Sequence, residues 1–421
     1  MTEPDPPAAF PPLTQSPPFR RLLVSIGAST LAGSALAVVL GYQVYTITRS
    51  PLALGYLGLV EAIPALSLAL LGGHVADRAD RRRILLVTQS VSVFCALLFA
   101  YFSRDTMPTV TALYAVVFLL GIARGFGGPA FGAFEAQIVP REQLLQASGY
   151  LSATWQTFAI LGPALGGVCY DRFGAATTYF GIAGLFAAGL VALTTIQSPK
   201  ALPRPALDKP AESLWKSIAV GVRFVFATPA LVGSMALDLF AVLFGGAVAL
   251  LPVFAKDILH VGAGGLGLLN AAPTVGALSA TLLATRFPPL KHAGRNLLIA
   301  VAAFGVSIIV FALSKNLYLT LFALFLAGIT DGVSMVIRKA IVRLLSPNEM
   351  RGRIAAVSMI FIGSSNEIGA LESGVAAHYL GTVRSVWIGG IITLLVVAAT
   401  AGLAPGLRNL RLTHGAKESD K

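Results

Sequence analysis

Hydrophobic positions in this chain form long continuous runs, unlike the alternation of a half-buried strand or the narrow apolar stripe of a soluble helix. An α-helix needs roughly 20 apolar residues to cross about 30 Å of hydrocarbon. Runs of that length recur along the whole sequence and predict about twelve membrane-spanning helices. The predicted spans are 23–48, 52–76, 84–103, 109–135, 146–170, 175–197, 229–254, 264–286, 295–313, 317–340, 353–379 and 383–404.

Polar segments between these runs predict the domain organisation. Residues 1–19 are rich in proline and lack the basic-then-apolar order of a signal peptide, so we expect a disordered cytoplasmic N-terminus. A proline- and charge-rich linker, with an amphipathic stretch, occupies 199–228. It separates a six-helix bundle at 20–198 from a second six-helix bundle at 229–405, and 406–421 is predicted to be a cytoplasmic tail.

The two predicted bundles repeat each other in sequence. An offset of 207 or 209 residues aligns glycine and proline positions in three separate helix regions, which chance matches between small residues do not readily produce. The pattern predicts homologous halves related by a pseudo-twofold axis. The aligned pairs include Gly121 and Gly328, Gly125 and Gly332, Gly162 and Gly369, Gly167 and Gly374, Gly174 and Gly381, and Pro64 and Pro273.

Composition and charge agree with a membrane protein. Hydrophobic residues make up 56% of the chain and charged residues only 12%, and the mean hydropathy is +0.78. The net charge of +12 is distributed by topology, because most Lys and Arg residues fall on the side of the N-terminus. This is the positive-inside pattern with both termini in the cytoplasm, so no nucleic-acid partner is expected. The opposite loops carry about one basic residue each: Arg49, Arg104, Arg172, Lys256, Lys315 and Arg384.

The most heavily charged loop, "GGHVADRADRRRIL", follows the second span. Gly73 is expected to let helices approach closely, and Asp77 to face the positive N-terminal end of a helix that begins near Ala355 in the other half. Arg78 is a basic residue directly after Asp77. Arg81 lies one turn beyond Asp77 and is expected to pair with Asp77 or with lipid phosphate. Fixing topology is the alternative role for these arginines.

Two parallel six-helix repeats are the architecture of the major facilitator transporters, in which a central site opens to each side in turn. The charged loop resembles that superfamily's signature between helices 2 and 3, with Asp80 where glycine is usual. The resemblance implies an all-α membrane protein with twelve transmembrane helices. It also implies that Gly73, Asp77, Arg78 and Arg81 form a latch that closes the cytoplasmic side.

A second motif lies in the fifth span, at Gly149 and in "GPALGG", which contains Gly162, Pro163, Gly166 and Gly167. It resembles the superfamily's antiporter motif, which implies a hinge or seal. Pro163 is expected to kink its helix, and the glycines to allow tight contact with a neighbour. Ordinary close packing would require the same residue types. Residues 237–259 and 351–374 further resemble the bacterial subgroup related to enterobactin exporters and macrolide efflux pumps.

Charged residues inside the spans are the candidates for transport chemistry, since each costs a few kcal/mol at bilayer depth unless it is paired or hydrated. Arg124, in "GIARGFGG", resembles a helix-4 motif that the family links to proton coupling. The repeat places Asp331 at the related position, so the two residues are expected either to form an ion pair or to take part in coupling. The full set is Glu61, Arg124, Asp238, Asp331, Glu367 and Glu372.

The carboxylates in this set leave several alternatives open. Asp238 is either a proton carrier or a permanently hydrogen-bonded side chain. Glu367 and Glu372 are five residues apart and point to different helix faces. Glu372, flanked by small residues, is expected to line the cavity, and Glu367 to end in a polar network. Glu61 has even chances of facing the cavity.

The sequence contains no GxxxxGK[ST] phosphate loop, no HExxH motif and no Cys/His cluster with metal-ligand spacing. We therefore expect no cofactor, no metal and no enzymatic activity. The prediction is a secondary active transporter of the bacterial inner membrane that exports an amphipathic small molecule, of the drug or siderophore class, in exchange for protons. It is expected to act as a monomer in the lipid bilayer. The alternatives are an uptake permease or lipid flippase of the same fold, and a non-transporting membrane scaffold or sensor.

Overall fold

The computed structural model describes residues 12–104, 109–197, 214–245, 247–347 and 350–412, and all of their regular secondary structure is helical. The first half contains α1 (Pro17–Thr48), α2 (Pro51–Arg78), α3 (Arg81–Phe102), α4 (Val110–Ile138) and α5 (Leu144–Thr194). The remaining helices are α6 (Leu214–Ala227), α7 (Pro229–Gly245), α8 (Leu251–Val253), α9 (Gly262–Arg286), α10 (Ala293–Leu313), α11 (Leu317–Leu345), α12 (Arg351–Leu380), α13 (Thr382–Leu403) and α14 (Pro405–Arg408).

Helix ends coincide with capping signals in the sequence. Pro17 and Pro51 occupy the first turns of α1 and α2, where a missing backbone N–H costs nothing. Asp80 caps α3 by accepting a 2.9 Å hydrogen bond from the backbone N–H of Arg82. Asp80, which stands where superfamily members usually carry glycine, therefore has a structural role in this chain.

Ten of the described helical segments are long and apolar enough to cross a membrane. One of them, α5, runs for 51 residues and consists of two arms that meet at Gly174, whose φ is 75°. The ten segments count α5 once, although it has two arms, and they leave out α12, whose 30 residues are also long enough to cross. With α5 counted as two crossings and α12 as one more, the number equals the predicted number of crossings. The prediction of a helix that ends near residue 170 and another that begins near 175 agrees with this break.

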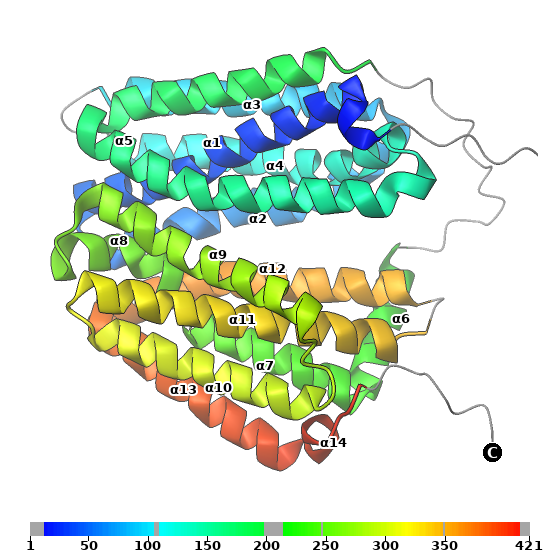
Figure 1. Cartoon of the computed structure of the whole chain (residues 1–421). Helices are drawn as coiled ribbons and strands as arrows, with labels where there is room; N and C mark the ends of the chain where they lie inside the picture. The colour runs from blue at the N-terminus through cyan, green and yellow to red at the C-terminus, as the bar shows by residue number, and fades with distance from the viewer. Residues whose placement is uncertain (1–11, 105–108, 198–213, 246, 348–349, 413–421) are drawn as a thin grey trace, which may run out of the picture.

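The predicted span at 229–254 is present as one apolar crossing, Pro229–Ile258, but it is not a continuous α-helix. The α-helix α7 ends at Gly245, and the chain continues through a 3-10 turn at Ala247–Leu250, the short α8 and a π-helix at Phe254–Ile258. Two successive glycines at 245 and 246 weaken the helix, and Pro252 lacks a backbone donor. This irregular segment lies at the far end of the molecule from the chain termini (Figure 1).

The predicted disorder and tail boundaries also need correction. A 3-10 turn at Leu13–Gln15 precedes α1, and Leu13 and Phe19 are buried, because these apolar side chains join the core of the first half. At the other terminus, Leu407 and Leu412 are buried against the second half, so the described part of the predicted tail is anchored there by these two side chains. Residues 1–11, 413–421 and the linker segment 199–213 lie outside the described residues, and α6 is the amphipathic stretch that follows them.

The helices pack in two halves whose axes run in roughly the same direction (Figure 1). Helices α1–α5 contact one another, as do α7 and α9–α13, and the principal contacts between halves join α5 to α9 and α2 to α12. Both described chain ends lie at the same end of the molecule, which we call the terminus end; the opposite end is the far end (Figure 1).

The predicted repeat is present in the packing. Gly121 of α4 lies against Pro64 of α2, and Gly328 of α11 makes the same contact with Pro273 of α9. Gly174 and Gly381, which the 207 offset aligns, both have positive φ, at 75° and 86°. Related positions thus make related contacts, as expected for homologous halves.

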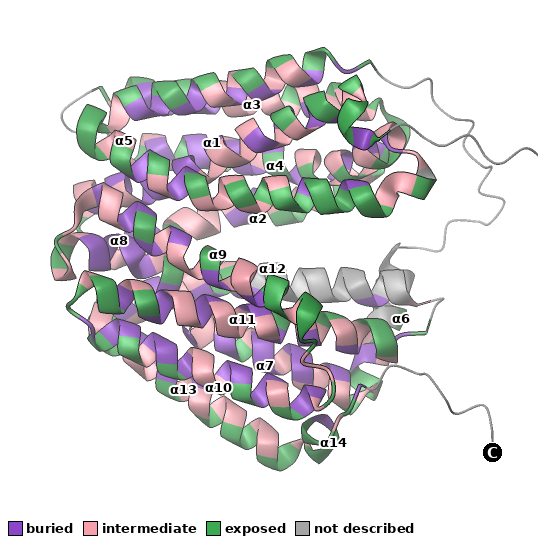
Figure 2. Ribbon diagram, in the orientation of Figure 1, coloured by how far each residue is buried: buried purple, intermediate pink, exposed green. Residues whose placement is uncertain are grey.

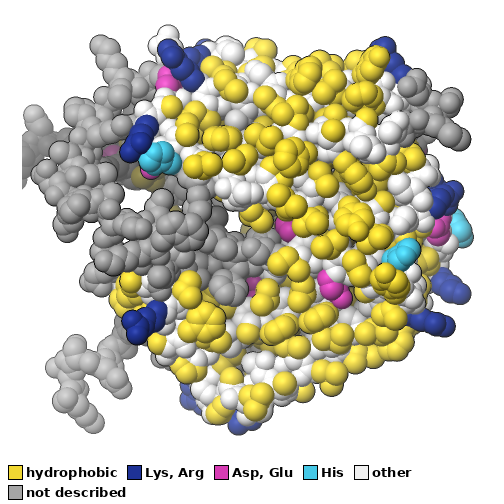
Figure 3. Space-filling model, turned by 180° about the vertical axis from the view of Figure 1, so that it is seen from behind, with side chains coloured by type: hydrophobic (Ala, Val, Ile, Leu, Met, Phe, Trp, Pro, Cys, Tyr) yellow, Lys and Arg dark blue, Asp and Glu magenta, His cyan; other side chains and the backbone are white. Residues whose placement is uncertain are grey.

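The outer surface suits a lipid environment. Large apolar side chains such as Phe94, Phe118 and Leu395 are exposed. Exposed and buried positions are interspersed along most of the helices (Figure 2). In the space-filling view, hydrophobic side chains cover the middle and basic side chains gather toward the two ends (Figure 3). This distribution is typical of a protein that spans a bilayer.

Candidate functional site: a central cavity between the halves

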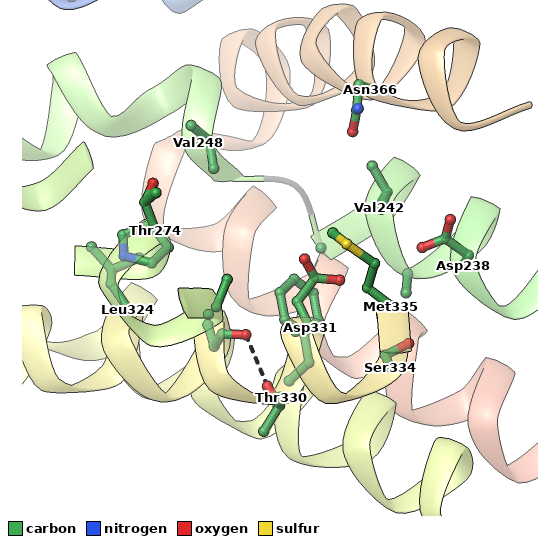
Figure 4. A pocket seen from close by; sticks show the side chains of 18 of the residues that line it. Asp238, Val242, Val248, Thr274, Leu324, Thr330, Asp331, Ser334, Met335 and Asn366 are labelled. Carbon is green, nitrogen blue, oxygen red and sulfur yellow. Dashed lines mark hydrogen bonds between the residues drawn. The ribbon is translucent and has the colours of Figure 1, made fainter. Parts of the chain in front are cut away.

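A cavity of about 1170 Å³ lies between the two halves at mid-depth and toward the terminus end. Its first-half wall includes Ser152, Trp155 and Gln156 of α5, which lie in the part of that helix nearest the terminus end. The second-half wall comes from α7, the 3-10 turn at Ala247–Leu250, α9, α10, α11 and α12, and Figure 4 shows part of it. Among the described side chains, the charged residues in the lining are Asp238, Asp331, Lys339 and Glu367.

Two predicted carboxylates meet at an arginine that the sequence analysis did not select. Arg338 of α11 forms an ion pair with Asp238 of α7, and its Nη2 lies 3.6 Å from Oδ1 of Asp331. The side chains of Asp238 and Arg338 are 9% and 13% exposed, whereas that of Asp331 is 43% exposed and faces the cavity (Figure 4). The pair satisfies a buried charge, and Asp331 is the member that solvent or a ligand can reach.

Arg338 was missed because it lies two residues before the predicted end of its span, at residue 340, and was counted with the basic loop that follows. The structure continues α11 to Leu345, so Arg124 is not the only arginine within a span. The spacing of seven residues between Asp331 and Arg338 was the available signal, because it places both on one helix face two turns apart.

Arg124 does not pair with Asp331. It forms an ion pair with Glu61, joining α4 to α2 within the first half. Of the two alternatives for Arg124 and Asp331, the ion pair between them is therefore wrong. The two residues lie in different halves, and each has an oppositely charged partner within its own half. The sequence left open whether Glu61 faces the cavity, and the structure pairs its carboxylate with Arg124.

Glu367 brings a carboxylate from α12 to the first half. It lines the cavity, its Oε2 lies 3.3 Å from the position that a Cβ would occupy on Gly58 of α2, and it is within electrostatic range of Glu61 and Arg124. Glu372 lines a separate small pocket of about 10 Å³ with Ser373 and Ser385. The two glutamates do point to different faces, but the expectation of which one lines the central cavity is wrong. No feature of the sequence indicated which face of α12 turns inward.

The GPALGG segment of α5 is a packing surface used on two sides. Gly162 and Gly166 lie against α1, where a Cβ would press on Ser34 and Ala35. Gly167 lies against the backbone of Ala263 at the start of α9, in the other half.

Pro163 belongs to the same inter-half contact. Its carbonyl lies against Gly267 of α9. The non-helical dihedrals within α5 are at Gly174, and the kink expected at Pro163 stays a prediction. A Cβ on Gly149 would meet nothing within 4 Å, so its part in a hinge or seal stays a prediction.

The charged loop at the terminus end differs from expectation in one glycine. Gly72 makes the close approach, against the backbone of Gly125 in α4, whereas a Cβ on Gly73 would meet nothing within 4 Å. Arg81 donates to the carbonyls of Ala76 and Ala133, at 3.2 and 3.4 Å, and so joins α2 to α4.

Two further residues of the predicted latch are exposed at the terminus end. Asp77 takes part in a polar or electrostatic interaction, and Arg78 ends α2. The side chains of 355–364, where the partner helix was expected, lie outside the described residues, and the latch stays a prediction.

Two aspartates that the sequence analysis did not select hold the halves together at the far end. Asp257, on the π-helix, accepts a hydrogen bond from Tyr45 and pairs with Arg49 at 2.9 Å, both at the end of α1. Lys256 donates to Thr46 at 2.6 Å. We call these contacts, together with those of Asp171 below, the far-end clasp.

Asp171 completes the far-end clasp from α5. Its carboxylate accepts hydrogen bonds from the backbone N–H groups of Ala263 at 2.9 Å and Gly264 at 2.7 Å, which open α9. A carboxylate at a helix N-terminus is stabilised by the unpaired N–H groups and the helix dipole. Asp171 therefore applies at the far end the chemistry that was predicted for Asp77 at the terminus end.

Among the described residues, no group of three or more His, Cys, Asp or Glu side chains is arranged to hold a metal. The fold and the inter-half cavity define the class of protein: a transporter of the major facilitator type. The chain belongs to the transmembrane secretion effector family, whose model matches residues 7–413.

The chain is similar to named exporters over nearly its whole length. It is 27% identical to the enterobactin exporter EntS of Citrobacter koseri over 405 residues, which cover 95% of this chain and 94% of the relative. The identity to the enterobactin exporter EntS of Escherichia coli K12 is also 27%, over 407 residues and 95% of each chain.

Solved structures share the fold. A bacterial homologue of the human lysosomal transporter Spinster, in an inward-facing unoccupied conformation, superposes with a TM-score of 0.72 at 14% identity, covering 93% of this chain and 96% of that one. A D-xylose–proton symporter gives a TM-score of 0.67 at 15% identity, covering 94% and 99%.

The Asp238–Arg338 pair yields a stability prediction. Arg338→Ala should lower the free energy of unfolding by about 3 kcal/mol, because it leaves the buried Asp238 carboxylate without a counter-charge. Adding Asp238→Asn should recover part of the loss. Thermal unfolding of the purified protein in detergent measures both effects. Asp331→Asn is the control, since this side chain is more exposed and more distant, and its cost should be clearly smaller. Equal losses for Arg338→Ala and Asp331→Asn, with no recovery in the double variant, would contradict the pairing.

The far-end clasp yields a prediction about access. In a background with Cys95→Ala and Cys169→Ala, a cysteine introduced by Val248→Cys reports on the far side of the cavity, because Val248 lines it near the 3-10 turn. Combining Asp171→Asn with Asp257→Asn should raise the rate of maleimide labelling from the far side several-fold. Arg172→Gln, an exposed change on the same surface, should leave the rate unchanged. An unaltered rate in the double variant would show that the clasp does not control access.

Proposed function

We propose that this protein is a secondary active transporter that exports an amphipathic small molecule across the bacterial inner membrane by alternating access, in exchange for protons. The observation that carries the proposal is the large cavity between two homologous halves, joined at the far end and lined with charged residues. Such a site serves passage across a membrane better than it serves a fixed scaffold. The named function of the relatives, export of enterobactin, supports outward transport.

Direction follows from the topology that the basic residues predict. With both termini in the cytoplasm, the cavity extends toward the cytoplasmic side and the far-end clasp closes the opposite side. A substrate would enter from the cytoplasm. Opening of the clasp, with closure at the Asp77 latch, would then release it outside, and a single chain contains all of these parts.

Two charge clusters are the candidates for proton coupling. The first joins Asp238, Arg338 and Asp331 in the second half. If Asp331 or Asp238 takes up a proton, Arg338 loses one of its two carboxylate partners, and the packing of α7 against α11 changes with protonation. The cluster thus provides a link between proton binding and helix arrangement.

The second cluster spans both halves. Glu367 of α12 lies beside α2 and near the Glu61–Arg124 pair. Separation of α2 from α12 would remove Glu367 from the field of Arg124, so the protonation of this carboxyl would depend on the conformation. The dependence is reciprocal, and a proton on Glu367 would in turn bias the conformation.

Inverted membrane vesicles test transport and coupling together. A panel containing enterobactin and several amphipathic drugs identifies a cargo, and accumulation of that cargo in the vesicles should collapse when a protonophore removes the proton gradient. Asp238→Asn should reduce gradient-driven accumulation at least about tenfold, a loss that corresponds to about 1.4 kcal/mol. Arg172→Gln is the surface control. Accumulation that persists without a gradient would contradict proton coupling, and flux in the opposite direction would identify an uptake permease instead.

A further inference from the structure

The lining of the cavity has the opposite charge balance to the whole chain. The protein has a net charge of +12, yet the described part of its central cavity is lined by three carboxylates and one ammonium. The ammonium group belongs to Lys339, eight residues after Asp331 on α11 and therefore about 12 Å nearer the terminus end. At mid-depth, the charged side chains of the lining that the structure describes are all carboxylates.

Neighbouring cations do not cancel this acidity. Arg338 is largely buried and is engaged by Asp238, and its closest approach to Asp331 is 3.6 Å. Arg124 is paired with Glu61, so Glu367 faces a group whose charge is already balanced. Asp331 and Glu367 therefore present negative charge to the space between the halves, and low-dielectric walls strengthen the field in that space.

The opposite wall has a different character. On α5 it presents Trp155, which is 56% exposed, with Ser152 and Gln156 on the same helix, and Phe131 of α4 adds a second aromatic ring. All of these side chains are uncharged. The cavity thus has an acidic wall on α11 and α12 and an aromatic, weakly polar wall on α4 and α5.

We propose that the cavity selects an amphipathic cation, whose positive group is directed toward Asp331 and Glu367 and whose ring system packs against Trp155. This inference rests on the proposed transport function and adds the charge and orientation of the substrate. A ligand cation gains Coulomb energy at the acidic wall and stacking or cation–π energy at the indole. The volume of about 1170 Å³ is at the upper end of small-molecule sites, so a multi-ring cation fits with accompanying water.

Two fluorescent probes with a similar ring system and opposite charge test the proposal. Rhodamine 123 is a cation and fluorescein an anion, and binding of each to the purified full-length protein is measured by fluorescence anisotropy in detergent at low salt. We expect rhodamine 123 to bind at least about tenfold more tightly than fluorescein. Asp331→Asn and Glu367→Gln should each weaken rhodamine binding several-fold, and raised salt should reduce the preference.

Matched variants separate charge from folding and from ring contact. Glu372→Gln changes a carboxylate on the same helix as Glu367 but in a separate pocket, and should leave rhodamine binding unchanged. Asp331→Glu keeps the charge and should retain most of the affinity. Trp155→Ala should weaken both probes, whereas Trp155→Phe should weaken them less.

Tighter binding of fluorescein than of rhodamine 123, or rhodamine binding that is indifferent to both Asp331→Asn and Glu367→Gln, would overturn the proposal. Because the assay contains no gradient and no second compartment, its outcome is separate from that of the vesicle experiment. A protein that binds the cation but fails to move cargo against a gradient would keep this inference and lose the proposed transport function. The converse result would reject cation selection and retain transport.

Discussion

A charge at bilayer depth must be paired or hydrated, and this requirement organises the interior of the protein. Asp238 and Arg338 satisfy it by pairing across α7 and α11, and Glu61 and Arg124 by pairing across α2 and α4. Asp331 satisfies it through the cavity to which it is exposed. The paired charges tie helices together within each half, and the hydrated carboxylate belongs to the space between the halves.

The two halves share their packing but differ in their charges. Equivalent glycines on α4 and α11 contact equivalent prolines on α2 and α9, so the backbone framework is nearly duplicated. On that framework the first half carries Arg124 where the second carries Asp331. The similar backbones of the two halves therefore give the cavity its shape. Residues that differ between the halves make the wall on α11 and α12 acidic and the wall on α4 and α5 aromatic.

Much of the fold could be predicted from the sequence, because the length of an apolar run and the identity of glycine and proline positions are local properties. The helix regions, the repeat and the break near Gly174 were accessible in this way. The broken helix after Gly245 was not, because apolar residues continue through it and the hydrophobic pattern does not change.

The candidate site could be predicted only in part. The sequence marks Asp238, Asp331 and Glu367 as unusual, but the groups near Asp238 and Glu367 come from other helices. Arg338 lies two residues before the predicted end of its span and was counted with the basic loop. The choice between Glu367 and Glu372 depended on how α12 is rotated. Asp171 and Asp257 were missed because their partners, a helix N-terminus and the end of α1, are distant in sequence and lie in the other half.

In the proposed transport cycle the far end opens and closes, and the kind of contact found there permits this. The Arg49–Asp257 pair is 61% and 38% exposed, and pairs so exposed contribute roughly 0–1 kcal/mol. A carboxylate at a helix N-terminus, as for Asp171, contributes a similar amount. Together with the glycine contacts of α5 and α9, these give a closed state that a few kcal/mol can open, which is the scale of a ligand's or a proton's differential binding. The buried Asp238–Arg338 pair, by contrast, would be costly to break outright. A proton or a cation in the cavity would therefore act by altering its surroundings, and the weakly held far end would give way.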